Sequence, residues 1–231
     1  MGEVIGPNAS FDAIESDIKA THQAASIRGD DWKTPAQNII GPVVSLLLVI
    51  DGKLAPVIVP LEQLESEIEL MDSESDLLVG AERDFLWNEL GRKAEDIYFE
   101  FIFPGGKNFY TKAKEDEQVS LMYLLAEILE SNLHPRLDPA VAAASAGRIR
   151  TQTDAYKAKV DAIRPLRVKK ELLSTVRKNV IRLGRSRLAA LKRVYLAAGF
   201  SETEIHQVIP DRPSSKKAAP AAEPGKENPP K

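Results

Sequence analysis

Apolar residues recur at three- and four-residue intervals along most of the chain, which is the spacing of one face of an α-helix. The first such run places Phe11, Ile14 and Ile18 on one face, directly after Ser10, whose hydroxyl suits a helix N-cap. This pattern predicts a helix over residues 10–27. The polar stretch RGDDWKTP that follows is typical of a loop.

The segment IIGPVVSLLLVIDGKLAPVIVP, residues 39–60, fits two local structures. The runs VSLLLVI and KLAPVIV flank an Asp-Gly dipeptide, which favours a β-hairpin at 43–59. A buried helix fits nearly as well, because the apolar residues also recur at helical spacing. Pro56 weakens both, since it removes a helix hydrogen bond or confines the strand to a sheet edge. Asp51 and Lys53 inside the segment argue against a membrane span.

The remaining elements are predicted from helical spacing and from residues that begin or end helices. Asp138 followed by Pro139 and the capping box SETE from Ser201 are clear helix starts, and Pro165 ends or kinks a long helix. The stretch IYFEFIF, residues 97–103, fits a strand as well as a helix. The predicted stretches are 60–76, 76–103, 118–132, 138–164, 166–198 and 201–208.

These elements predict a mainly α protein, an elongated helical bundle of about five to seven helices. Residues 1–211 are interpreted as one domain, with an acidic part at 1–146, a basic long-helix part at 147–199 and a short capping helix at 201–208. Residues 212–231 are rich in Pro, Ala, Lys and Glu and contain no large apolar residue. Such a segment cannot form a core, so a disordered tail is predicted there.

Charge is distributed unevenly, although the net charge is only −3. Residues 1–146 hold 11 Lys and Arg against 26 Asp and Glu, whereas residues 147–194 hold 15 against 3. Opposite charge in two parts of one chain indicates either an internal electrostatic match or surfaces for different partners.

The basic helix at 166–198 separates cations from apolar residues when it is drawn at 100° per residue. Leu173, Val176 and Leu183 lie on the apolar side, which is expected to face the core. Gly184 lies on the same side, where the missing side chain would let another helix approach closely. The candidate partner or nucleic-acid face is formed by Arg167, Lys170, Arg177, Lys178, Arg182, Arg185, Lys192 and Arg193.

Several environments are open to these cations. The simplest is solvent on the outside of a bundle, and another is pairing with an acidic helix such as 61–76, within the chain or across an oligomer. Nucleic acid fits the arginines but not the acidic net charge or the lack of interleaved aromatic residues. A membrane surface is disfavoured because the apolar side lacks the Trp and Phe of interfacial helices.

Motifs of catalysis, metal binding or cofactor binding are missing from the sequence. There is no cysteine, and the histidines at 22, 134 and 206 do not stand at metal-ligand spacings. No phosphate-binding glycine motif or nucleophile elbow occurs. No catalytic, metal or cofactor residue is therefore assigned.

The loop FIFPGGKNFYTK is the most site-like stretch outside the basic helix. Gly105 and Gly106 permit unusual backbone angles beside Lys107, Asn108 and Tyr110. We interpret these five residues as a candidate partner contact, with a plain tight turn as the simpler alternative.

The sequence thus predicts a non-enzymatic helical interaction or assembly protein that packs with itself or with a protein partner. The alternative is a nucleic-acid-binding protein that uses the cationic face of helix 166–198, and an enzyme without a recognisable motif comes third. The N-terminal residues show no secretory signal, so a cytoplasmic location is expected.

Overall fold

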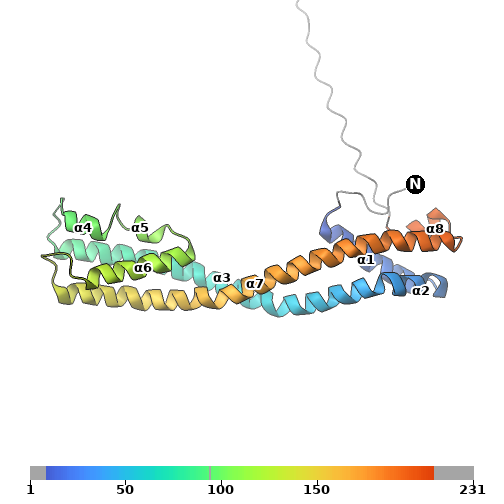
Figure 1. The fold of residues 1–231 in the computed structure, drawn as a ribbon, viewed down its shortest axis with the longest axis horizontal. Helices are drawn as coiled ribbons and strands as arrows, with labels where there is room; N and C mark the ends of the chain where they lie inside the picture. The colour runs from blue at the N-terminus through green and yellow to red at the C-terminus, as the bar shows by residue number, and fades with distance from the viewer. Residues whose placement is uncertain (1–8, 94, 211–231) are drawn as a thin grey trace, which may run out of the picture. The chain divides into compact units, whose positions relative to one another are not determined.

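A computed structural model describes residues 9–93 and 95–210, and every regular element in these ranges is a helix (Figure 1). This confirms the mainly α prediction. The predicted tail at 212–231 lies outside the described residues. The helices are α1 Phe11–Ser26, α2 Asp30–Ile39, α3 Gly41–Glu89, α4 Ile97–Ile102, α5 Asn108–Thr111, α6 Glu115–Glu130, α7 Pro139–Ala197 and α8 Glu202–His206.

The hairpin alternative at 43–59 is wrong, because this segment belongs to the 49-residue helix α3. Val43, Leu47, Ile50, Leu54 and Val57 are all buried, at alternating intervals of four and three residues. That repeat belongs to a helix and not to a strand, in which alternate residues would be buried. The contacts of this continuous buried face outweigh the backbone hydrogen bond that is lost at Pro56.

Other boundaries also differ from the sequence prediction. The stretch RGDDWKTP contains the start of α2 instead of a loop, and its Trp32 and Ala36, one turn apart, are buried. Helix α7 runs without a break through Pro165. The predicted caps are confirmed, since Ser10 accepts a hydrogen bond from Ala13 N–H at 3.2 Å and Ser201 forms the capping box with Glu204.

The chain divides into two compact units, and both α3 and α7 contribute to each. Unit 1 comprises Met1–Leu54 and Leu172–Lys231, and unit 2 comprises Ala55–Glu171. Unit 1 therefore contains α1, α2 and α8, whereas unit 2 contains α4, α5 and α6. Each unit has a hydrophobic core cluster of its own.

In unit 1, α7 packs closely against α1 and α3 at Gly184. A Cβ atom at this position would lie 2.2 Å from Cδ1 of Ile18 on α1 and 3.1 Å from Cγ1 of Val43 on α3. The close approach predicted from the sequence is therefore confirmed. Nearby, the Tyr195 hydroxyl donates a hydrogen bond of 2.7 Å to the carbonyl oxygen of Trp32, which ties α7 to α2.

In unit 2 the core contains more aromatic residues than in unit 1, and both units bury carboxylates. Phe103 is in ring contact with both Phe99 and Tyr110, and α4, α5 and α6 gather around this part of α3 and α7 (Figure 1). Glu82 of α3 is 5% exposed and accepts hydrogen bonds of 2.5 and 2.8 Å from the Arg148 guanidinium of α7. This pair fixes the two long helices against each other.

Candidate interaction surfaces

Arg177, one of the predicted surface cations, belongs to an internal charge network of unit 1. Its Nη2 lies 2.6 Å from Glu15 Oε2 on α1, and its Nε donates to Asp51 Oδ1 on α3 at 3.1 Å. Lys19 of α1 lies 2.6 Å from Glu15 and 3.5 Å from Asp51. The hydrogen bond with Glu15 raises the pKa of Lys19. Four charges from three helices thus neutralise one another, including the Asp51 charge inside the apolar segment of α3.

Two further cations of the predicted face also have internal partners. Arg167, in unit 2, makes bonds of 2.7 and 3.0 Å to the Glu115 carboxylate and reaches Glu65 at 4.0 Å. The hydrogen bond to Glu115 raises the pKa of Arg167. Lys192 is buried, with its Nζ 3.7 Å from Glu202. The sequence placed Arg167 and Lys192 on one cationic face with Arg177. In the structure, each of these three residues has a different internal contact.

The remaining cations of that set differ in exposure. Lys170, Lys178 and Arg193 are exposed and have no ion pair among the described residues. Arg182 is exposed, donates to Asn179 at 3.2 Å and lies over the Phe11 ring. Arg185 is half-buried and takes part in interactions within the chain. The predicted stripe is therefore divided between structural and solvent-facing side chains.

The apolar side of α7 in unit 1 is rotated relative to the sequence prediction. Val176 and Leu183, expected in the core, are 49% and 42% exposed. Ile181 and Leu188 are fully buried instead. At 100° per residue, Val176 and Leu183 point about 140° and 160° away from Ile181. They therefore lie outside the buried side of α7.

Helix α3 exposes apolar residues in the same unit. Leu46 and Val49 are 46% and 55% exposed, and they point about 140° and 160° away from Asp51, whose carboxylate contacts Lys19 of α1. They therefore face away from α1. We call Leu46, Val49, Val176 and Leu183 the uncovered face of unit 1.

Acidic residues are missing from the α7 side of this unit. Residues 172–197 hold seven Lys and Arg and no Asp or Glu. Arg187 and Arg193 lie on the two sides of the direction of Val176 and Leu183, at about 30° and 90° from their mean direction. The uncovered face is thus an aliphatic surface with cationic borders.

Among the described helices, α3 alone is long and apolar enough to cross a membrane by length and composition. Its most apolar window is only 28% buried. The aliphatic residues of this segment are divided between the core and the surface, where Leu48 and Val59 are 61% and 68% exposed.

The loop residues Gly105 to Tyr110 separate into backbone, surface and core positions. Gly105 and Gly106 have φ of 71° and 81°, which is the left-handed conformation that favours glycine. Lys107 and Asn108 are exposed. Tyr110 is fully buried and donates to the Ile102 carbonyl oxygen at 2.5 Å, and burial raises its pKa to about 12. Tyr110 therefore holds the turn and is not available as a surface contact.

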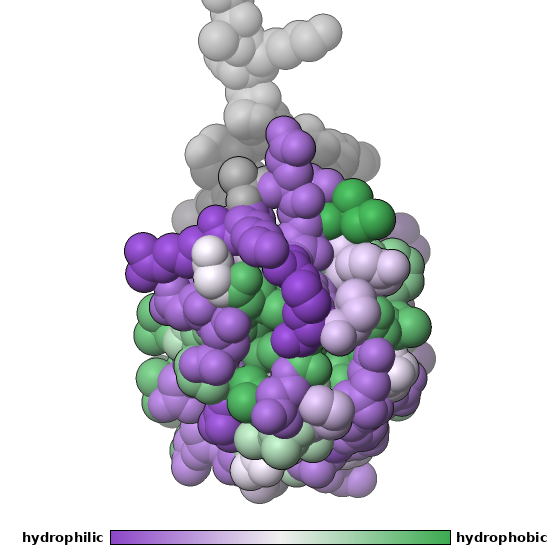
Figure 2. Space-filling view, turned by 90° about the vertical axis from the view of Figure 1, so that its left-hand side faces the viewer, coloured by the Kyte–Doolittle hydropathy of each residue, from purple (hydrophilic) through white to green (hydrophobic). Residues whose placement is uncertain are grey.

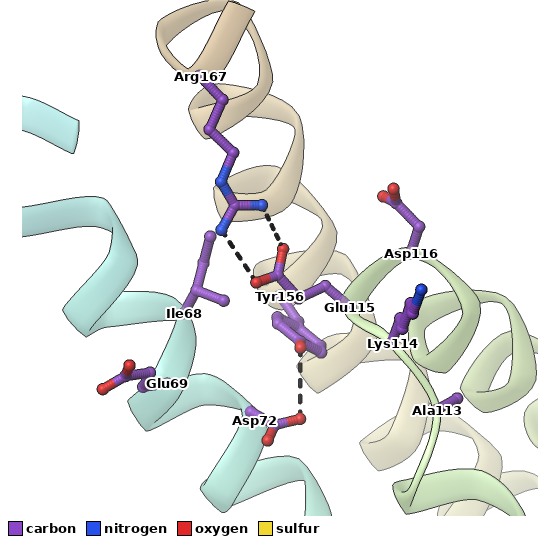
Figure 3. A pocket seen from close by; sticks show the side chains of 9 residues that line it. All are labelled: Ile68, Glu69, Asp72, Ala113, Lys114, Glu115, Asp116, Tyr156 and Arg167. Atoms are coloured by element: carbon purple, nitrogen blue, oxygen red, sulfur yellow. Dashed lines mark hydrogen bonds and ion pairs between the residues drawn. The ribbon is translucent and has the colours of Figure 1, made fainter. Parts of the chain in front are cut away.

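A hollow of about 510 Å³ opens in unit 2 between α3, α6 and α7 (Figure 3). Figure 3 shows the Arg167–Glu115 pair spanning it and the Tyr156 hydroxyl directed at Asp72, 3.4 Å away. Burial and the Asp72 carboxylate raise the pKa of Tyr156. The charged groups of this hollow largely satisfy one another, so it has the character of an interhelical ion-pair site.

The buried carboxylate Asp96 organises the end of unit 2. Its Oδ1 accepts hydrogen bonds from the N–H groups of Tyr98 and Phe99, which caps α4, and lies 3.1 Å from His134 Nε2. Its Oδ2 pairs with Arg136. Burial opposes the charge of Asp96, but these hydrogen bonds and the nearby cations hold its pKa below the usual value. Seen end-on, hydrophobic side chains show between hydrophilic ones on this face (Figure 2).

Within the described ranges, no group of three or more His, Asp or Glu side chains is placed to hold a metal ion. Comparison of the chain with protein-family models, curated proteins and solved structures finds no match. Sequence reasoning did not identify Leu46 and Val49 as surface residues. The available signal was that apolar residues surround α3 between 43 and 59 on more than one face, which a single buried stripe does not require.

Proposed function

We propose that this protein is a non-enzymatic helical interaction protein that binds a protein helix through the uncovered face of unit 1. The observation that supports this most directly is the exposure of Leu46 and Val49 on α3 and of Val176 and Leu183 on α7. Exposed aliphatic surface is characteristic of protein or membrane contact sites.

The energetics favour a helical partner. Burying one leucine or valine side chain that is otherwise exposed contributes about 1.5–3 kcal/mol. Two parallel or antiparallel helices also provide a groove into which a third helix packs its apolar ridge. The internal network around Arg177 keeps α1, α3 and α7 in register, so the face is formed before a partner arrives.

Nucleic acid remains the second candidate, because Lys178 and Arg193 are exposed and have no ion pair among the described residues. Its support is weaker, since Arg167, Arg177 and Lys192 have acidic partners within the chain. A duplex or single strand would also leave the aliphatic residues without a partner.

Sedimentation velocity over a range of protein concentrations tests the proposal. The wild type should form a defined oligomer or retain a stoichiometric protein partner, and Val49→Glu with Leu183→Glu should abolish this while circular dichroism stays unchanged. The matched control is Ile27→Glu, because Ile27 is 82% exposed in the same unit but lies outside the uncovered face. A strictly monomeric wild type without a partner would refute the proposal.

A titration with labelled duplex and single-stranded nucleic acid separates the two candidates. Binding that weakens steeply with salt and disappears in Lys178→Glu with Arg193→Glu would favour nucleic acid. No binding of either nucleic acid at low salt would exclude this candidate and leave the protein partner.

A further inference from the structure

We infer that the helix bound by the uncovered face of unit 1 is the acidic segment of α3, around Leu70 and Leu77, from a second copy of this chain. This inference rests on the proposed function and specifies its partner. It is based on opposite charge and equal apolar spacing in residues 55–82 of α3 and residues 172–197 of α7.

The acidic segment lacks cations as completely as the basic segment lacks acids. Residues 55–82 of α3 hold eight Asp and Glu and no Lys or Arg, whereas residues 172–197 of α7 hold seven Lys and Arg and no Asp or Glu. A contact between two uncovered faces would place cations against cations, and a contact between two acidic segments would place acids against acids. Contact between unlike segments of two copies is therefore favoured by charge.

The outward side of the acidic segment also carries leucines in the required positions. Leu70 and Leu77 are 60% and 71% exposed, and they stand seven residues apart, as Val176 and Leu183 do on α7. A seven-residue repeat keeps apolar side chains on one seam between two packed helices. Glu62 and Glu74 flank the leucines, at about 70° and 50° from their mean direction.

The flanking charges are available for such a contact. Glu62, Glu74, Arg187 and Arg193 are exposed, and none has an ion pair within the described part of the chain. Figure 3 shows the carboxylate of the neighbouring Glu69 pointing away from Arg167, whereas Glu65 and Glu67 pair with Arg167 and Lys159.

A charge-swap experiment tests this pairing. Sedimentation equilibrium is measured for Arg187→Glu with Arg193→Glu, for Glu62→Lys with Glu74→Lys, and for a mixture of the two variants. Each variant alone should lose at least tenfold in self-association, and the mixture should recover a mixed complex. The control is Glu100→Lys with Glu127→Lys, which reverses two exposed acids of unit 2 on α4 and α6 and should associate like the wild type.

The outcomes distinguish failure of the pairing with the acidic segment from failure of the proposed function. If Val49→Glu with Leu183→Glu abolishes association but the swapped mixture does not recover it, the pairing with the acidic segment is wrong and the proposed function stands. If the wild type is monomeric and sediments with vesicles of anionic lipid, the second copy is excluded and the face binds a membrane. If none of these variants changes association, both proposals fail.

Discussion

Unit 1 and unit 2 share the helices α3 and α7, but they hold them together by different means. Unit 1 brings helices into close contact at a glycine and places its charges in one network around Arg177. Unit 2 packs aromatic rings from Phe99 through Phe103 to Tyr110 and pairs its buried Glu82 with Arg148. Both units bury carboxylates and aromatic rings, so they differ in how the buried charges are partnered and in the close helix approach at Gly184.

The comparison extends to charge and to what each unit exposes. Residues 9–54 and 172–210 hold 11 Lys and Arg against 8 Asp and Glu, whereas residues 55–171 hold 15 against 22. Because close packing at Gly184 holds α1 on one side of α3 and α7, the opposite side stays uncovered. The mode of packing in unit 1 is thus connected with the surface that we assign to a partner.

Replacing Gly184 with leucine should have the largest effect on stability. Ile18 is fully buried and has no room to move, so a side chain at position 184 forces α1 away from α7. Overpacking of this size costs about 3 kcal/mol. Urea unfolding followed by the fluorescence of Trp32, in a Trp87→Phe background, reports on unit 1. The control is Gly52→Leu, because a Cβ at Gly52 meets no atom within 4 Å.

Replacing Arg148 or Arg177 should lower the free energy of unfolding by less than Gly184→Leu does. The two losses should also differ from each other. Arg148→Met leaves the buried Glu82 without its cation and should destabilise unit 2 by about 2 kcal/mol. Arg177→Met should cost only about 1 kcal/mol, because Lys19 still contacts Glu15. Each loss is measured by urea unfolding with the tryptophan of the affected unit. Equal losses would contradict the view that Glu15 shares its charge between Arg177 and Lys19 whereas Glu82 depends on Arg148.

Low pH should destabilise unit 2 because it protonates the Asp96 carboxylate. Its folded-state pKa lies below the usual value, so it stabilises the folded state above about pH 4. That stabilisation is lost as the pH falls through the folded-state pKa. The free energy of unfolding, followed by Trp87, should therefore fall more steeply with acid in the wild type than in Asp96→Asn. Asp84→Asn, on the exposed side of α3, is the control and should keep the wild-type pH profile.

The local signals in the sequence predicted helix ends well and helix orientation poorly. Ser10 and Ser201 were identified correctly because capping depends on residues within one turn. Gly184 was also interpreted correctly, because a glycine inside a long helix usually reflects a packing requirement. These features need no knowledge of distant parts of the chain.

The errors arose where distant contacts decide the outcome. The Asp-Gly dipeptide at 51 and 52 suggested a turn, but Asp51 pairs with Arg177, which is 126 residues away, and α3 continues. A helical wheel gave the separation of cations from apolar residues on α7 but not which part of it faces the core. Packing against α1 and α3 at Gly184 makes that choice, and Ile181 is buried while Leu183 is exposed.

The smallest predicted effects test whether the two units unfold separately. Gly147 of α7 and Gly52 of α3 are exposed, and a Cβ at either position meets no atom within 4 Å, so each change to alanine should stabilise its helix by about 1 kcal/mol. Because the core clusters are distinct, Gly147→Ala should raise the transition reported by Trp87 more than that reported by Trp32. Gly52→Ala should raise the transition reported by Trp32 more than that reported by Trp87. If either change shifts both transitions equally, α3 and α7 couple the units into one cooperative structure, and the difference in packing between them does not create two independent stabilities.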